Sequence, residues 1–249
     1  MIHAVLFDLD DTLSDYSKSA RWSLSQAADY AVDHNTNLTA LGVQQAYYRA
    51  REELQREAAQ LGESLYSRRA GVEVRHLVWE RALQLCGVSN PLLAKAVAAR
   101  YGLARTQTAS LFPDALPLLT QLKQGYRLGL VSNGASDIQR EQLSEKVLGL
   151  LPFFAAILIE GEVGYGKPAP AIFGLAAQQL ECEASEAVFV GDSPAEDIAG
   201  AQGAGMRAVW VNRSGQLLAS EDPSPDAEIA RLSDLPPALQ TLSGARTEP

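Results

Sequence analysis

Five short runs of apolar residues lie along the chain, and none of them alternates between apolar and polar positions. Runs of about four to eight such residues are typical of strands buried on both faces, as in a parallel sheet. We therefore expect five buried strands, at Ala4–Phe7, Leu128–Val131, Ala155–Ile159, Ala187–Val190 and Ala208–Val211. A shorter edge strand is predicted at Ala227–Ile229.

Segments with helical spacing of apolar residues separate these runs. Leu116, Leu119 and Leu122 recur on one helical face, and Gly125 provides a stop. The predicted helices span Asp114–Gln124, Asp137–Leu148, Pro170–Leu180 and Pro194–Gly203, and Ser233 is expected to cap a last one before a frayed tail at Gly244–Pro249. The alternation of strands and helices predicts an α/β fold with a doubly wound parallel sheet.

The region between the first two strands breaks this alternation, because it contains helical patterns only. Four helices are predicted there, at Tyr16–His34, from a Thr39 cap to Leu61, at Val72–Leu85, and from Asn90 to Arg105. The expected organisation is a discontinuous core, residues 1–13 and 111–249, with an all-helical insert at residues 14–110. We expect the aromatic side chains of the insert to form its own core; they are Trp22, Tyr47, Tyr48 and Trp79.

Composition limits the possible partners. The chain has 249 residues, with 21 Lys and Arg against 30 Asp and Glu, so its formal net charge is −9. This balance disfavours a nucleic acid polymer or an anionic membrane surface as a partner. The first apolar run stops at Asp8, and no uncharged apolar run reaches the roughly 18 residues of a membrane helix. A cytoplasmic protein is expected, and its two cysteines, Cys86 and Cys182, form no metal-binding or disulfide pattern.

Polar residues follow the predicted strands at the points where these strands end. They are Asp8 and Asp10 after the first strand, Ser132, Asn133 and Gly134 after the second, Lys167 beyond the third, and Asp192, Ser193 and Asp197 after the fourth. In an open α/β sheet, ligands bind outside the carboxyl ends of the strands. We therefore expect these residues to converge at one edge of the sheet, although Lys167 taken alone is equally a surface cation.

Each group of polar residues also has a plainer interpretation. Asp8 and Asp10 repel each other unless a divalent cation is bound, or unless one is an acid and the other a nucleophile, but Asp-Asp-Thr is also common in solvated turns. Asp192 suits Mg²⁺ together with Asp8, or it caps a helix. Ser132 and the turn at Asn133–Gly134 offer a hydroxyl and free backbone N–H groups to an anion, or they form an ordinary turn.

In this order, the groups together resemble the four motifs of the haloacid dehalogenase (HAD) superfamily of phosphohydrolases. The motifs are Phe7-Asp8-Leu9-Asp10-Asp11-Thr12-Leu13, Val131-Ser132-Asn133-Gly134, Lys167-Pro168, and Val190-Gly191-Asp192-Ser193 with Asp197. The resemblance covers residues 1–13 and 111–215, and the insert is similar in position and helical content to the cap of subclass I. It implies a Rossmann-like core with an inserted helical cap domain. The spacing from Asp192 to Asp197 is similar to the branch of pyrimidine 5′-nucleotidases, N-acylneuraminate-9-phosphatases and phosphoglycolate phosphatase-like enzymes.

The resemblance implies Mg²⁺-dependent hydrolysis of a small phosphate monoester, such as a nucleoside monophosphate, a sugar phosphate or phosphoglycolate. Asp8 would be the nucleophile that forms an aspartyl-phosphate, and Asp10 would protonate the leaving oxygen and then activate water. The phosphoryl group would be bound by Ser132, Asn133 and Lys167, and Mg²⁺ by Asp8, the Asp10 carbonyl and Asp192. Supporting roles would fall to Thr12, Gly134, Ser193 and Asp197.

Two other functions stay open. A phosphomutase has the same fold, the same pair of aspartates and a similar cap, and a catalytically silent binding protein would keep only the fold. The resemblance favours phosphate esters over halides, because family members that displace halide lack an acid at the position of Asp10. The expected partner is a small phosphorylated metabolite, and the expected state is a monomer or a homodimer. In the insert, the turn Tyr66–Arg69 either places a cation over the site or is a solvated connection.

Overall fold

The computed structural model describes residues 1–66 and 69–244. Six parallel strands form one sheet in the order β3-β2-β1-β4-β5-β6. They are β1 (Ala4–Phe7), β2 (Arg127–Ser132), β3 (Ala156–Ile159), β4 (Ala187–Gly191), β5 (Arg207–Val211) and β6 (Ala227–Ile229). The central strands β1 and β4 are buried along their whole length, which explains their continuous apolar runs. The predicted doubly wound parallel sheet is therefore confirmed, and each predicted strand agrees to within one residue at either end.

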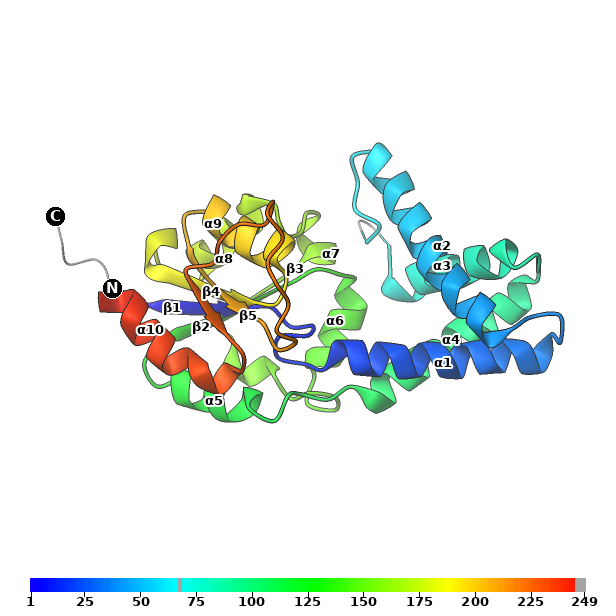
Figure 1. The fold of residues 1–249 in the computed structure, drawn as a ribbon, viewed down its shortest axis with the longest axis horizontal. Coiled ribbons are helices and arrows are strands. Elements are labelled where there is room, and N and C mark those ends of the chain that lie inside the picture. The colour runs from blue at the N-terminus through cyan, green and yellow to red at the C-terminus, as the bar shows by residue number, and fades with distance from the viewer. Residues whose placement is uncertain (67–68, 245–249) are drawn as a thin grey trace.

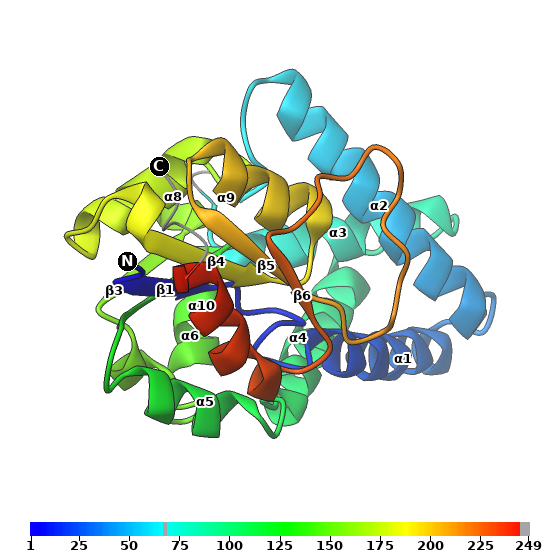
Figure 2. The same ribbon diagram turned by 60° about the vertical axis from the view of Figure 1, so that its left-hand side comes forward.

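Helices cover both faces of the sheet, as Figure 2 shows. Val5 and Phe7 of β1 pack on one face with α5 (Ala115–Leu122), α6 (Ser136–Leu143) and α10 (Leu235–Gly244). Ala4 and Leu6 pack on the other face with α8 (Pro170–Gln179) and α9 (Ala199–Gly203). Successive side chains of a strand point to opposite faces, so each strand contributes to both layers. The shorter elements are α7 (Glu160–Val163), η1 (Leu151–Phe153), η2 (Ala184–Glu186), η3 (Pro194–Ile198) and η4 (Leu232–Asp234).

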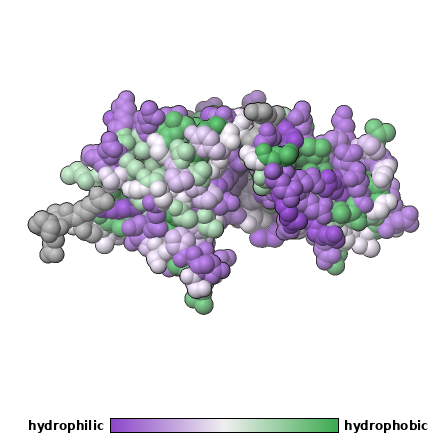
Figure 3. Space-filling view, turned by 90° about the horizontal axis from the view of Figure 1, so that it is seen from above, coloured by the Kyte–Doolittle hydropathy of each residue, from purple (hydrophilic) through white to green (hydrophobic). Residues whose placement is uncertain are grey.

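Four long helices form a separate bundle, the cap, to one side of the sheet (Figure 1). They are α1 (Tyr16–His34), α2 (Ala40–Gln60), α3 (Gly71–Leu85) and α4 (Pro91–Thr108). The N-terminal helix caps predicted for α2 and α4 are present. The side chain of Thr39 accepts a hydrogen bond from the Gly42 N–H at 3.2 Å, and that of Asn90 accepts one from the Leu93 N–H at 3.1 Å. Figure 3 shows that the face of the cap seen from above is largely hydrophilic. None of the helices built by residues 1–66 and 69–244 is both long and apolar enough to cross a membrane.

The chain passes between sheet and cap twice, and the two passages run side by side. The Asp15 N–H donates to the Ser110 carbonyl at 2.9 Å, and the Phe112 N–H donates to the Leu13 carbonyl at 2.9 Å. Since the first passage directly follows β1, the cap lies beyond the carboxyl end of that strand (Figure 1). The division of the chain at residues 13/14 and 110/111 remains a prediction.

Two aromatic residues of the cap do not lie where the sequence predicts them. Trp79 is fully buried and packs against Tyr47, as expected. Trp22 and Tyr48, however, are 45% and 49% exposed. Each sits next to a position that faces the bundle, the buried Ser23 on α1 and the partly buried Tyr47 on α2, and one residue is a 100° turn around a helix. Helical spacing indicates that a helix has an apolar face, but it does not show which of two neighbouring residues lies on the face that packs in the bundle.

Three predicted helices also differ in extent. The helix expected over Asp137–Leu148 ends at Leu143, because Ser144 is extended. The segment Pro194–Gly203 divides into the π-helical η3 and the short α9. The last helix begins at Leu235, after the 3-10 turn η4 that contains Ser233, so Ser233 does not cap it. In the predicted tail, Gly244 is the last residue of α10, and residues 245–249 lie outside the described residues.

Candidate active site

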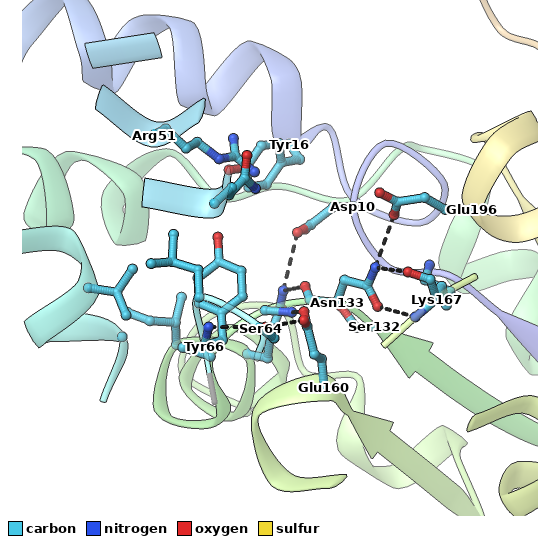
Figure 4. A pocket seen from close by; sticks show the side chains of 18 of the residues that line it. Asp10, Tyr16, Arg51, Ser64, Tyr66, Ser132, Asn133, Glu160, Lys167 and Glu196 are labelled. Carbon is cyan, nitrogen blue, oxygen red and sulfur yellow. Dashed lines mark hydrogen bonds between the residues drawn. The ribbon is translucent and has the colours of Figure 1, made fainter. Parts of the chain in front are cut away.

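The predicted site residues meet at the carboxyl edge of the sheet. Asp8 follows β1, Ser132 ends β2 and Asp192 follows β4, and these three strands are parallel neighbours. The strand order reverses between β1 and β4, which is the position where open α/β sheets bind ligands. A pocket of about 580 Å³ opens there between the sheet edge and the cap. Figure 4 shows it from close by.

One side of the pocket, the core wall, consists of residues from the sheet edge and from α6. They are Asp8, Asp10, Ser132, Asn133, Gly134, Gln139, Gln142, Glu160, Lys167, Asp192, Ser193, Glu196 and Asp197. Every predicted site residue except Thr12 thus lines the pocket. Thr12 lies beneath it, fully buried, and its hydroxyl donates to Asp192 Oδ1 at 3.2 Å.

Lys167 is the central cation of the core wall. Its ammonium nitrogen donates to Asp8 Oδ1 at 2.5 Å and to Asp197 Oδ1 at 2.6 Å, and none of these side chains is more than 7% exposed. Burial alone would lower the pKa of Lys167, but Asp197 and Asp8 together raise it above its ordinary value. Asn133 fixes the backbone here, since its side chain accepts from the Lys167 N–H at 2.7 Å and donates to the Lys167 carbonyl at 2.9 Å. Lys167 is therefore a charged site residue and not a surface cation.

The same region carries more negative charge than this lysine balances. One oxygen from each of Asp8, Asp192 and Asp197 lies within 4.8 Å of the others. Burial raises the pKa of Asp8 well above its usual range; Lys167 opposes this effect, and Asp197 adds to it. Burial, with Asp197 and Asp11 adding, raises the pKa of Asp192 to about 7. Three crowded carboxylates against one ammonium group form an acidic cluster that can bind a divalent cation.

Asp10 occupies a different environment from Asp8. Its carboxylate accepts from the side-chain amide of Gln142 at 3.1 Å, from that of Gln139 at 3.3 Å, and from the Ser14 hydroxyl at 3.3 Å. Burial raises the pKa of Asp10, whereas Arg105 and the two glutamine amides act in the opposite direction. The hydrogen bonds fix the orientation of this carboxyl group inside the pocket (Figure 4).

The turn after β2 differs in one respect from the prediction. Ser132 is 1% exposed and lines the pocket, and among the described residues its hydroxyl has no hydrogen-bond partner. The Gly134 N–H, expected to be free for an anion, instead donates to Glu160 Oε2 at 2.9 Å. Glu160 follows β3, the neighbour of β2, and so reaches this turn. Gly134 has a φ of 136°, a conformation that glycine adopts readily.

Glu160 also joins the two sides of the pocket. Its other carboxylate oxygen accepts a short hydrogen bond from the hydroxyl of Ser64, which belongs to the cap (Figure 4). A second cross-contact lies close by, where the Gly71 N–H of the cap donates to Asp137 Oδ1 of α6 at 2.7 Å. The cap therefore contacts the turns next to Ser132 directly.

The opposite side of the pocket, the cap wall, is rich in tyrosine and arginine. Its polar residues include Tyr16, Tyr47, Arg51, Gln55, Glu63, Ser64, Tyr66, Arg75, Tyr101 and Arg105. Of the turn proposed to place a cation over the site, Tyr66 lines the pocket, Arg69 is exposed, and residues 67–68 lie outside the described residues.

Sequence reasoning missed several of these residues. Glu160 directly follows a predicted strand, so the strand-end argument that found Asp8 applies to it as well. Gln139 and Gln142 are three residues apart on a helix, a spacing that places them on one face, but nothing in the sequence indicates that this face is turned toward Asp10. The cap residues carry no comparable signal.

These features define the class of the protein. It is an α/β protein with a doubly wound sheet, an inserted helical cap, and a ligand-binding crevice at the sheet edge where the strand order reverses. Residues 2–205 match the family model described as haloacid dehalogenase-like hydrolase, and the chain belongs to this family of hydrolases. The resemblance seen in the four motifs is therefore confirmed.

Similar proteins include two phosphatases. The chain is 30% identical over 250 residues to N-acylneuraminate-9-phosphatase from Mus musculus, and the match covers 97% of this chain and 95% of that protein. It is 33% identical over 248 residues to glyceraldehyde 3-phosphate phosphatase from Methanopyrus kandleri, covering 98% and 99%. Among solved structures, 2-haloacid dehalogenase from Pseudomonas syringae is similar with a TM-score of 0.73 and 32% identity, covering 97% of this chain and 99% of that one.

Proposed function

We propose that this protein is a Mg²⁺-dependent phosphatase that hydrolyses a small phosphate monoester through an aspartyl-phosphate. The observation that carries this proposal is the arrangement of Asp8 and Asp10 in one pocket. Asp8 is paired with Lys167, whereas Asp10 is held by two neutral amides. Two carboxyl groups in such different surroundings suit two roles, nucleophile and acid–base. The two similar phosphatases support the same reaction class.

In this proposal, a carboxylate oxygen of Asp8 attacks phosphorus and the bond from phosphorus to the leaving oxygen breaks. Asp10 donates its proton to that oxygen, so the product leaves as an alcohol. Asp10, now ionised, takes a proton from a water molecule that attacks the same phosphorus. The bond to Asp8 then breaks, and inorganic phosphate and the starting carboxylate result.

Charge is the main obstacle to the first step. Two like charges about 4 Å apart cost about 4 kcal/mol at an effective dielectric constant near 20, and a phosphate dianion meets Asp8 at close range. Lys167 reduces this cost by its contact with Asp8 at 2.5 Å. The Ser132 hydroxyl and the backbone N–H of Asn133 would donate to phosphoryl oxygens.

The acidic cluster fits Mg²⁺, which prefers carboxylate oxygens and keeps several waters. Asp8 and Asp192 would bind it with the Asp10 carbonyl, and Thr12 orients Asp192 for this role. Asp197 would support the site without binding the ion, because its two oxygens already accept from Lys167 and from the Ser193 N–H at 2.9 Å. When bound, Mg²⁺ would supply the positive charge that this crowded site lacks.

The similarity to a haloacid dehalogenase makes halide displacement the second candidate. A halide leaves without a proton, so a dehalogenase needs no acid beside its nucleophile. Asp10, half-buried and oriented by Gln139 and Gln142, has no task in that reaction. We therefore place phosphate ester hydrolysis first.

The test is an assay of purified protein with p-nitrophenyl phosphate and with 2-chloropropionate, each with Mg²⁺ and with chelator. We expect steady release of phosphate that requires Mg²⁺ but no bisphosphate activator, and no release of chloride. In a single turnover with ³²P-labelled substrate, acid quenching should leave label on the protein. Chloride release, or a protein that is never labelled, would overturn the proposal, and turnover that needs a bisphosphate would indicate a phosphomutase.

A further inference from the structure

Arg51 of α2 differs from the other arginines of the cap wall, because among the described residues its guanidinium group forms no ion pair, donates no hydrogen bond and stacks on no ring. Its side chain is half-buried and lines the cap wall. Among residues 1–66 and 69–244, no carboxylate lies within ion-pair distance of its guanidinium group, and this group donates no hydrogen bond. Burial acts to lower the pKa of Arg51, whereas four tyrosines that line the same pocket raise it; they are Tyr66, Tyr16, Tyr47 and Tyr101.

The other two arginines of the cap wall are already engaged. Arg105 donates to the Tyr16 carbonyl at 3.2 Å, its guanidinium carbon lies 4.0 Å from the centroid of the Tyr16 ring, and it is in electrostatic contact with Asp10. Arg75 lies against Gly102, with its guanidinium carbon 5.9 Å from the centroid of the Tyr101 ring. Arg75 and Arg105 thus each contact an aromatic ring, whereas no ring of the described residues holds Arg51, and its guanidinium group is available to a ligand.

Arg51 lies on the side of Asp10 that a leaving group must occupy. Figure 4 places Arg51 and Tyr16 on one side of Asp10, and Ser132 and Lys167 on the other. Burial raises the pKa of Tyr16, and among the smaller effects Arg51 lowers this pKa while Asp10 raises it, so both charged groups act on the Tyr16 hydroxyl. A substrate with its phosphoryl group at Ser132 and its leaving oxygen at Asp10 would therefore extend toward Arg51.

We propose that Arg51, with the tyrosine hydroxyls around it, binds a carboxylate at the far end of the substrate's leaving group. This inference rests on the phosphatase function proposed above and narrows its substrates to phosphate monoesters of hydroxy acids. A planar guanidinium group pairs with a carboxylate through two parallel hydrogen bonds, which a point charge such as lysine cannot do.

A carboxylate fits this subsite better than a second phosphate group does. One unpaired guanidinium group balances a single negative charge, whereas a phosphate monoester carries nearly two. Phenolic hydroxyls are neutral donors that complete the coordination of a carboxylate without adding charge. Arg105 is less available to a ligand, because it donates to the Tyr16 carbonyl and stacks on the Tyr16 ring.

The experiment compares matched substrates that differ only in the carboxylate. The pairs are 6-phosphogluconate with sorbitol 6-phosphate, and 3-phosphoglycerate with glycerol 3-phosphate, in which a hydroxymethyl group replaces the acid. In at least one pair we expect kcat/KM to favour the acid about 10- to 100-fold, as for a lost charge-assisted hydrogen bond. Arg51→Met should reduce this ratio to near one, and Arg51→Lys should leave an intermediate ratio.

Arg49→Met is the matched control, because Arg49 is an exposed arginine of the same helix that does not line the pocket. It should keep the wild-type ratio. A wild-type enzyme without preference in either pair, or a preference that survives Arg51→Met, would overturn the proposal. So would an Arg51-dependent preference for fructose 1,6-bisphosphate over fructose 6-phosphate, since that would assign the subsite to phosphate.

Failure of the phosphatase function is distinguishable from failure of this inference. If the wild-type protein hydrolyses no phosphate ester, including p-nitrophenyl phosphate, the proposed reaction is wrong. The same pairs then serve as intact ligands in calorimetry with Mg²⁺ present. Tighter binding of the acid that is lost in Arg51→Met would still support the carboxylate subsite, and equal binding would refute it.

Discussion

The two walls of the pocket are built in opposite ways. On the core wall, the chain itself supplies fixed partners for several charged groups: Lys167 pairs with Asp8 and Asp197, and Asp10 is held by Gln139 and Gln142. On the cap wall, an arginine that has no carboxylate partner among the described residues lines the pocket together with four tyrosines. Fixed charges suit a reaction whose reacting atoms are the same for every substrate. Unpaired groups suit recognition, because their interactions are completed by the ligand.

Hydrogen bonds join the two walls close to Ser132, the residue proposed to bind the phosphoryl group. Ser64 of the cap donates to Glu160, and Glu160 accepts from the Gly134 N–H beside Ser132. The difference between the two walls leads to a testable expectation. Changes in the core wall should affect every substrate, whereas changes in the cap wall should alter the ranking of substrates.

The largest effect is expected for Asp8, the proposed nucleophile. Asp8→Asn keeps the shape of the side chain and an acceptor for Lys167, but a neutral amide oxygen does not attack phosphorus. We expect kcat to fall by about 1,000-fold or more on every substrate, whatever its leaving group. Thermal unfolding should stay within about 5 °C of the wild-type midpoint. Hydrolysis of p-nitrophenyl phosphate at the wild-type rate would refute the assigned nucleophile.

Removal of the metal should come next. Chelator should stop turnover, and added Mg²⁺ should restore it. Because an ion bound only by the folded state stabilises it, Mg²⁺ at 100 times its Kd should raise the free energy of unfolding by about 2.7 kcal/mol. Asp192→Asn should lose most of this response, while Asp29→Asn, an exposed carboxylate of the cap, should keep it. An unchanged response in Asp192→Asn would place the ion elsewhere.

A smaller effect on activity is expected for a residue that orients Asp10. Gln142→Leu removes the amide that donates to Asp10 at 3.1 Å, so the carboxyl group loses its fixed orientation. We expect kcat to fall about 10-fold with a smaller change in KM, since a hydrogen bond to a charged group is worth about 1.5–3 kcal/mol. Gln121→Leu, at an exposed position of α5, is the control. A rise in KM alone would show that Gln142 contacts the substrate instead.

The two walls also differ in how far the sequence predicts them. The core wall follows from one rule, because a buried strand that ends in a polar residue places that residue at the sheet edge. The rule predicts the positions of Asp8, Ser132 and Asp192, and it applies equally to Glu160, which directly follows β3. It did not foresee that Glu160 would take the Gly134 N–H, because that contact depends on the spacing of β2 and β3 in space.

The cap wall follows from no such rule. Helical spacing defined the four helices, yet it assigned Trp22 and Tyr48 to the interior while both are exposed. The direction that a helix face takes depends on how the bundle packs, and a rotation of about 100° moves a neighbouring residue into its place. For the same reason, nothing in the sequence separates Arg51, which lines the pocket, from Arg49, which is exposed.

The smallest effect, a change in stability, is expected at an exposed ion pair that joins two helices next to the core wall. Arg140 of α6 contacts Glu162 of α7 at 2.7 Å, and hydrogen bonds from its guanidinium group lower the pKa of Glu162. With side chains 41% and 31% exposed, water screens the pair, so Arg140→Gln should cost only about 0.2–1 kcal/mol at pH 7. The contribution of Glu162 is complete above its unfolded pKa of 4.5 and is lost as the pH falls through its lower folded value. A double-mutant cycle with Glu162→Gln, measured by urea unfolding at pH 7 and pH 3, checks this sign. A coupling that stays the same at pH 3 would mean that the two helices are joined by packing and not by charge.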